Sequence, residues 1–314
     1  MSIIVVQKQM LIIFAMILIG VFVFKRKHLS NASARDLSWL IVNITNPITL
    51  LCAALREEEK VSHGEVGMAF LAFGIMYVIL IVSAHLIQLM LRVPKGTGYA
   101  YRMLAIFGNV GFIGIPFANA VLGPKSLIFV TICGLSFTMV FYTYGFADLG
   151  MAAAKQNPGT TREKISLKKL INSGTVLAII TIAIYLSDVR VPESLQSFLT
   201  YIGNCTTFLS MVVLGISVAQ MVPREVFSSW RLYVFVILRQ ILIPILTVYL
   251  LAPVIESKLL LSTVAVMVSM PAANLSLMTA KLMNVKEDLI SAGIILTTVT
   301  SIITIPIVMM FVPV

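Results

Sequence analysis

Charged residues are scarce in this chain of 314 residues. Only 11% of the residues are Asp, Glu, Lys or Arg, whereas 59% are hydrophobic. Soluble domains typically have about 25% charged and about 45–50% apolar residues, so the composition excludes an ordinary soluble fold. The net charge of +10 does not indicate a nucleic-acid partner, because the basic residues lie in short loops between apolar stretches and form no compact basic domain.

Residue patterns that build metal centres or catalytic sites are also lacking. Cys52, Cys133 and Cys205 all lie in apolar stretches without metal-ligand spacing, and we interpret them as small hydrophobic residues. No Ser/His, paired-Asp or HExxH pattern indicates an enzyme, and no glycine-rich stretch continues into the Gly-Lys-Ser/Thr of a phosphate-binding loop. We therefore expect no enzymatic activity, no cofactor and no bound metal.

Long apolar runs are what the sequence has in abundance. A membrane-spanning helix needs about 20 predominantly apolar residues. Ten stretches, numbered here as spans one to ten, meet this description: 7–24, 36–55, 65–91, 99–121, 125–149, 170–188, 195–220, 230–254, 258–283 and 288–312. We interpret the first as a retained helix, since no basic region of the secretory kind precedes it. The sequence thus predicts an all-α polytopic membrane protein.

Lysine and arginine are distributed unevenly between the loops. Sixteen of the 23 fall on one side of the ten predicted spans and six on the other, while Arg239 lies inside a span. Because cytoplasmic loops carry the excess of Lys and Arg, this predicts both termini outside the cytoplasm and the 150–169 loop inside it. We expect the protein in the cell membrane, plasma or inner, with the lipid bilayer as its surroundings.

The 150–169 segment is the longest polar stretch and separates two halves, 1–149 and 170–314. Each half has five predicted spans, so the second half enters the membrane in the opposite sense. This is the sequence geometry of an inverted repeat. The second and seventh spans both contain an Asn-x-Thr triplet, beginning at Asn43 and Asn204.

Helix-breaking residues occur in corresponding spans of the two halves. Span four contains GNVGFIGIPFANAVLGP with Pro116, and span nine contains MPAANLS with Pro271. Proline removes a backbone donor, and free backbone groups at membrane depth must be buried in protein or line a cavity. We expect two discontinuous helices, broken at 108–116 and 268–274, that cross near the bilayer midplane. Their exposed N–H groups favour an anion, whereas the alternative use of such residues is close helix packing.

These motifs resemble the auxin efflux carrier family, in a match that covers essentially the whole chain. GNVGFIGIP, MPAANLS and the early asparagine of the second span carry the resemblance, and the short central loop is similar to that of bacterial members. The fold is related to that of the bile-acid/sodium symporters. The resemblance implies crossed, broken helices four and nine, a scaffold of spans 1, 2, 6 and 7, and a transport domain of spans 3–5 and 8–10. It also implies an elevator motion, commonly in a homodimer, and an organic anion as substrate, auxin in plants and small carboxylates in bacteria.

Polar or conformationally special residues inside the spans are the candidates for substrate binding. They are Asn43, Asn109, Gly111, Pro116, Pro271, Asn274 and Arg239. Amide groups can donate hydrogen bonds to a carboxylate. Arg239 has two interpretations: it binds a carboxylate through its forked donors, or it holds exposed carbonyls near a helix break.

His85 and Asp148 are candidates for proton coupling. Histidine titrates near neutral pH, while its alternative use is a hydrogen bond between helices; the alternative for Asp148 is a cap or an ion pair. No acid lies at the centre of a span, which favours H+ over Na+ as coupling ion. We therefore expect a secondary transporter of a small organic anion, with efflux as the expected direction. The alternatives are a sodium-coupled organic-anion symporter and a membrane sensor that binds a ligand without moving it.

Overall fold

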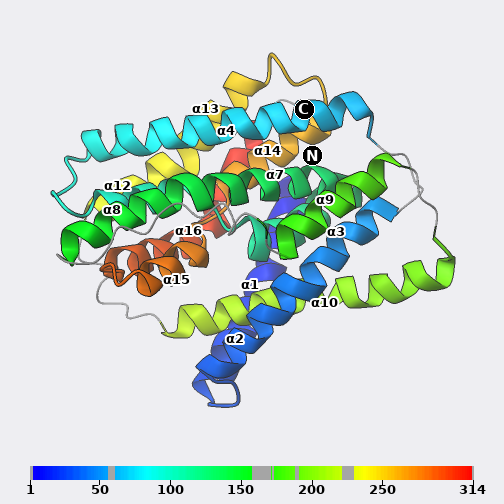
Figure 1. Ribbon diagram of the computed structural model, residues 1–314, viewed down its shortest axis with the longest axis horizontal. Helices are drawn as coiled ribbons and strands as arrows, with labels where there is room; N and C mark the ends of the chain where they lie inside the picture. Colours follow the sequence, from blue (N-terminus) through cyan, green and yellow to red (C-terminus); the bar gives the residue numbers. More distant parts are fainter. Residues whose placement is uncertain are drawn as a thin grey trace.

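The structure is a computed structural model that describes residues 3–55, 61–157, 171, 173–187, 191–220 and 230–312. Within these residues the chain is helical apart from turns and connecting segments, and its only β-type pairing there is an isolated bridge between Gly108 and Ala272. Long helices run along the longest axis of the molecule, with α4 on one side, α10 on the other, and α7 and α8 between them (Figure 1).

The first half of the chain forms α1 (Ile3–Lys25), α2 (Asn31–Leu40), η1 (Ile41–Thr45), α3 (Asn46–Leu55), α4 (His63–Met90), α5 (Gly98–Ile106), η2 (Val110–Gly114), α6 (Ile115–Leu122), η3 (Pro124–Ser126), α7 (Leu127–Val140), η4 (Phe141–Gly145) and α8 (Phe146–Gln156). The second half forms α9 (Ser173–Leu186), α10 (Glu193–Gln220), α12 (Trp230–Ile237), η6 (Leu238–Leu242), α13 (Ile243–Leu251), α14 (Lys258–Ser269), α15 (Asn274–Leu282) and α16 (Asp288–Met310). The elements η1, η4 and η6 are π-helical turns that join the helices on either side, and η2 is one that continues into α6.

Each predicted span coincides with helical residues of the described part. Seven continuous helical stretches of the described part, some of them made of several consecutive elements, are long and apolar enough to cross a membrane. Three shorter apolar helices, Val110–Leu122, Thr175–Leu186 and Lys258–Ser269, lie in predicted spans four, six and nine. The class of polytopic membrane protein is thereby confirmed, while the inverted relation of the two halves stays a prediction.

The first group of packed helices contains α1, α3, α9 and α10. In this group α1 packs on α10, α10 on α3, and α3 on α9. Glycine permits the closest of these contacts: a Cβ atom added at Gly20 would lie 2.4 Å from the carbonyl oxygen of Val212, and one at Gly215 would lie 2.2 Å from that of Ile17. Because both obstacles are backbone atoms, only glycine fits without moving a helix.

The second group contains the helices around α4 and α14. Here α4 packs on α5 and α7, α14 packs on α13 and α16, and α5 packs on α16. An aromatic cluster in this group joins Phe107 to Phe137 and Phe141, with ring centroids 5.7 Å and 4.9 Å from that of Phe107. The cluster anchors Phe107, the residue that directly follows α5.

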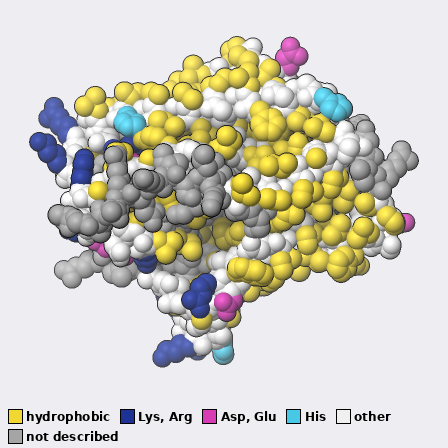
Figure 2. Space-filling model, viewed as in Figure 1, with side chains coloured by type: hydrophobic (Ala, Val, Ile, Leu, Met, Phe, Trp, Pro, Cys, Tyr) yellow, Lys and Arg dark blue, Asp and Glu magenta, His cyan; other side chains and the backbone are white. Residues whose placement is uncertain are grey.

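The outer surface has the composition expected for contact with lipid. Hydrophobic side chains cover most of the described face in Figure 2, while Lys and Arg gather at its left edge and its lower tip. On α4 alone, Leu71, Val78 and Leu86 each expose more than half of their surface. A helix that presents such residues outward along its length agrees with a transmembrane position.

The predicted boundary of span five is wrong. We expected the helix to end at residue 149, but α8 continues to Gln156. The added residues include three consecutive alanines, which have the highest intrinsic helix propensity. Residues 158–169 of the predicted 150–169 loop lie outside the described part of the structure.

Candidate functional site

Span four is interrupted at Phe107–Asn109. Helix α5 ends at Ile106, and helical structure resumes with the turn η2 at Val110. Asn109 caps the new helix, because its side-chain Oδ1 accepts a hydrogen bond from the backbone N–H of Phe112 at 3.1 Å. Asparagine is among the best N-cap residues, so the sequence itself specifies where the second half-helix begins.

Span nine is interrupted at Met270–Ala273. Helix α14 ends at Ser269, and α15 begins at Asn274. Pro271 lies inside this break, as predicted, and its missing N–H requires no partner there. The side-chain Oδ1 of Asn274 is buried and accepts no hydrogen bond from a described residue.

The two breaks pair with each other as a short antiparallel segment. The N–H of Asn109 donates to the carbonyl of Pro271 at 2.6 Å, and the N–H of Ala273 donates to the carbonyl of Phe107 at 2.9 Å. Gly108 and Ala272 form the bridge between them. The predicted meeting of the interrupted helices is therefore confirmed, and we call residues 107–109 with 270–273 the crossing.

The proline of span four does not make the break. We expected the break over 108–116 with Pro116 at its end, but the structure confines it to Phe107–Asn109, and Pro116 lies inside the helical segment 110–122 that follows. The break lies before it, where the pairing with Pro271 replaces helical hydrogen bonds. Gly111 lies in the π-helical turn between the two positions.

Arg239 holds the ends of the half-helices that precede the crossing. Its Nε donates to the carbonyl of Ala105 in the last turn of α5 at 2.5 Å, and its Nη1 donates to that of Val268 in the last turn of α14 at 2.6 Å. The side chain is 1% exposed, and its Nη2 is buried without a hydrogen-bond partner in the described part. Of the two interpretations of Arg239, the geometry therefore matches the one in which it holds carbonyls near a break.

A second set of hydrogen bonds braces the crossing from α16. The hydroxyl of Thr297 accepts from the N–H of Ala272 at 3.1 Å. Gln240, the neighbour of Arg239 in η6, donates to the carbonyl of Thr297 at 2.8 Å and accepts from the hydroxyl of Thr300 at 2.5 Å. Sequence reasoning missed these three residues, although a glutamine inside an apolar span was a detectable signal.

In the second span, Asn46 approaches the half-helix that follows the crossing. The side chain of Asn43 donates back to the carbonyl of Trp39 in its own helix at 2.9 Å. Asn46 is 8% exposed, and a Cβ atom added at Gly111 would lie 3.8 Å from its Nδ2. Asn43 lies inside the π-helical turn η1 and Asn46 directly follows it, so the extra residue of this turn changes the helix face on which Asn46 lies. The side-chain Oδ1 of Asn46 is buried without a partner among the described residues.

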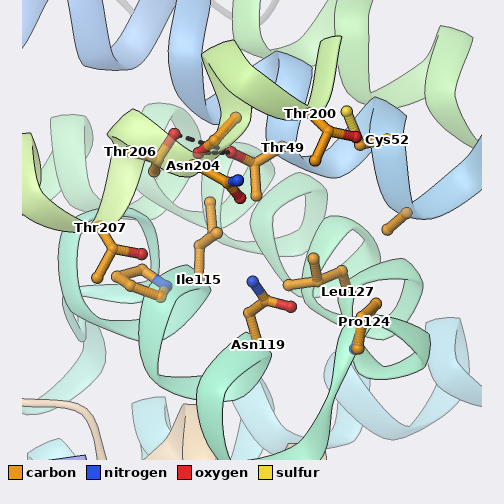
Figure 3. A pocket seen from close by; sticks show the side chains of 13 residues that line it. Thr49, Cys52, Ile115, Asn119, Pro124, Leu127, Thr200, Asn204, Thr206 and Thr207 are labelled. Atoms are coloured by element: carbon orange, nitrogen blue, oxygen red, sulfur yellow. Dashed lines mark hydrogen bonds between the residues drawn. The ribbon is translucent and has the colours of Figure 1, made fainter. Parts of the chain in front are cut away.

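A small pocket adjoins the half-helix that follows the break in span four (Figure 3). It has a cavity volume of about 70 Å³, and Ile115 and Pro116 form part of its wall. Its polar lining comes from α3, α6 and α10 and consists of Thr49, Asn119, Thr200, Asn204, Thr206 and Thr207. Asn119 and Asn204 point into the pocket from opposite sides (Figure 3). All of the residues that line it are uncharged, so any binding there depends on hydrogen bonds.

The contacts found for the two candidates for proton coupling in the described part join them to residues outside the crossing. Asp148 forms a two-pronged ion pair with Arg102, with N–O distances of 2.9 Å and 2.5 Å. His85 is exposed on α4; its Nδ1 lies 2.9 Å from the carbonyl of Ile81, and its Nε2 lies 3.4 Å from the hydroxyl of Tyr144. Both contacts match the structural alternatives stated for these residues, and a role in proton coupling stays a prediction.

The fold and the crossing define a polytopic membrane protein built around two interrupted helices. The chain belongs to the membrane transport protein family, whose family model matches residues 5–309. This confirms the resemblance to the auxin efflux carrier family. The chain is also similar to the uncharacterized transporter MJ1031 of Methanocaldococcus jannaschii, with 24% identity over 305 residues that cover 94% of this chain and 95% of the relative. Membership of a transport family agrees with the expectation that the chain is not an enzyme.

Proposed function

We propose that this chain is a secondary transporter of a small organic anion whose carboxylate binds at the crossing. The observation that carries the proposal is the pairing of Asn109 with Pro271 and of Phe107 with Ala273. This pairing brings together the starts of two helical segments, 110–122 and α15. Each helix start carries a partial positive charge and favours an anion by about 0.3–1 kcal/mol, and by up to about 2 kcal/mol when partly buried.

The pocket beside the half-helix 110–122 supports a small substrate. Its volume of about 70 Å³ is room for roughly five water molecules, so the solute is a compact one. Ile115 and Pro116 connect the pocket to the half-helix that Asn109 starts. A carboxylate at the crossing would therefore extend its remaining atoms toward the hydroxyl and amide groups of the pocket.

The packing supports an elevator motion between two bodies. The group of α1, α3, α9 and α10 corresponds to the scaffold that the family resemblance implies, and the helices around α4 and α14 correspond to the transport domain. The pocket lies between α3 and α10 on one side and α6 and α7 on the other. A solute in it would contact both bodies, as alternating access requires.

A binding screen tests the proposal most directly. Purified protein is heated with malonate, L-malate, L-lactate or indole-3-acetate, and each acid is compared with its neutral primary amide. A ligand that binds only the folded state stabilises it by about 2.7 kcal/mol at 100 times Kd. We expect at least one acid, and not its amide, to raise the melting temperature. If none does, the proposed substrate class is wrong.

Counterflow distinguishes a transporter from a sensor. Proteoliposomes are loaded with the unlabelled acid that bound in the screen, and uptake of the labelled acid is followed. We expect transient accumulation of label above equilibrium. A protein that binds the acid but shows no exchange is a sensor, and transport is then excluded.

Sodium coupling is the second candidate function. It is favoured by buried oxygen atoms near the start of α15 that accept no hydrogen bond from described residues, Oδ1 of Asn274 and Oγ of Ser276. Sodium prefers such neutral oxygen ligands, and the described residues contain no cluster of His, Cys, Asp or Glu that would hold another metal. Counterflow that disappears when choline replaces sodium would support this candidate.

A further inference from the structure

The crossing brings together four helix ends, and only two of them favour an anion. The starts of segment 110–122 and of α15 carry partial positive charge, whereas the ends of α5 and α14 carry partial negative charge. The two kinds of end have opposite charges of similar size. Four bare ends at one place would therefore give little preference for a negative solute.

Arg239 lies at the two negative ends. It donates to the carbonyl of Ala105 in the last turn of α5 and to that of Val268 in the last turn of α14. One guanidinium thus binds the end of one half-helix from each half of the chain. Cations and hydrogen-bond donors at a helix C-terminus compensate its partial charge.

The positive charge of Arg239 has no acidic partner in the described residues. The ion pairs found there join Arg35 with Asp36 and Arg102 with Asp148. The Nη2 of Arg239 is buried without a hydrogen-bond partner in the described part. It faces the crossing, since a Cβ atom added at Gly108 would lie 3.6 Å from it. A buried charge without a counter-charge is costly unless something else supplies that charge.

We propose that Arg239 sets the charge selectivity of the crossing. It compensates the negative ends of α5 and α14, so that the positive helix starts and its own charge dominate the field felt by the solute. The transported anion supplies the missing counter-charge when it binds. Arg239 is in this sense a specificity-determining residue that acts through the two helix ends, and the inference rests on the proposed function.

Two substitutions at the same position separate charge from hydrogen bonding. Arg239→Gln keeps a donor but removes the charge, while Arg239→Lys keeps the charge but not the fork that reaches both carbonyls. The matched control is Arg231→Gln, because Arg231 also donates to the end of a helix, the carbonyl of Leu91 at 3.0 Å, but away from the crossing. The probes are malonate with malonamide and L-lactate with L-lactamide.

The expected result is a change in the preference for the acid over its amide, and not only in the melting temperature of the protein. Arg239→Gln should weaken carboxylate binding by at least about tenfold, of the size expected from uncovering two helix ends. It should leave binding of the neutral amide within about twofold. Arg239→Lys should keep most of the preference for the acid over the amide, even if its melting temperature falls. Arg231→Gln should bind as the wild type does.

The outcomes that contradict the inference differ from those that contradict the proposed function. If the wild type prefers no acid over its amide, the proposed function fails and the role of Arg239 fails with it. If the wild type prefers an acid and Arg239→Gln keeps that preference, only the present inference is overturned. Equal losses in Arg239→Gln and Arg239→Lys would show a purely structural residue. If Arg239→Gln does not fold, the test depends on Arg239→Lys. If Arg239→Lys folds but no longer prefers the acid over its amide, the inference is overturned.

Discussion

Replacing the capping asparagine of the crossing by aspartate tests whether an anion binds there. Asn109 is 4% exposed, and its Oδ1 accepts from the N–H of Phe112 at 3.1 Å. Asn109→Asp has the same shape and keeps this acceptor, and aspartate caps a helix as well as asparagine does. A negative charge at a helix start also contributes about 0.3–1 kcal/mol of stability. The variant should therefore fold.

The same substitution should nearly abolish anion binding. With an effective dielectric constant of about 20, two like charges about 5 Å apart repel each other by about 3 kcal/mol. Since about 1.4 kcal/mol corresponds to a tenfold change, the affinity of the variant at Asn109 for a carboxylate should fall on the order of 100-fold. The loss of the two amide donors adds to this effect.

The control for Asn109→Asp is the same change at another helix start. Asn31 is the first residue of α2, is exposed, and follows the capping Ser30. Melting temperatures without ligand should lie close to that of the wild type for both variants, while titration with the acid found in the screen should show lost binding for Asn109→Asp only. Wild-type affinity in folded Asn109→Asp would refute the placement of the anion at the crossing.

Two further predictions concern what holds the helices together. Gly215→Ala should lower the free energy of unfolding by about 1–3 kcal/mol, because its Cβ would meet the backbone of α1. Gly74→Ala should raise it by about 0.5–1 kcal/mol, because a Cβ atom added there has no described neighbour within 4 Å. Similar melting temperatures for the two variants would contradict this packing. Asp148→Asn leaves the largely buried charge of Arg102 without its partner and should lower the free energy of unfolding by about 3 kcal/mol. Asp36→Asn removes a partner from an exposed ion pair and should lower it by less than about 1 kcal/mol. A thermal melt in detergent that ranks these two in the reverse order would refute the assignment.

Hydropathy was enough to predict where the helices lie, because the requirement for long apolar runs leaves few alternatives. It located the break in span four only to the range 108–116. We expected the break to include Pro116, since proline is the residue that interrupts a helix on its own. In the structure it falls at Phe107–Asn109, where the partner for the exposed backbone is Pro271 of span nine. A contact between residues so distant in the chain leaves no periodic signal in either segment.

The candidate site was predictable in its chemistry and not in its geometry. The pairing of two interrupted spans and the capping role of asparagine follow from residue types. That Asn46 approaches Gly111 depends on a π-helical turn, which shifts the helix face and has no sequence signature. The position of the Arg239 side chain could not be predicted for the same reason, since Arg239 also lies in a π-helical turn.

The breaks in spans four and nine depend on each other. A single interrupted helix at membrane depth would leave N–H and carbonyl groups without partners, at a cost of several kcal/mol. Here Asn109 and Ala273 donate to carbonyls of the opposite break, and Ala272 donates to Thr297. Each break thus supplies hydrogen-bond partners for the other, so restoring a continuous helix in one span would leave the other span unpaired. The two interruptions are for this reason one structural unit, and a substitution that straightens either span should remove anion binding from both.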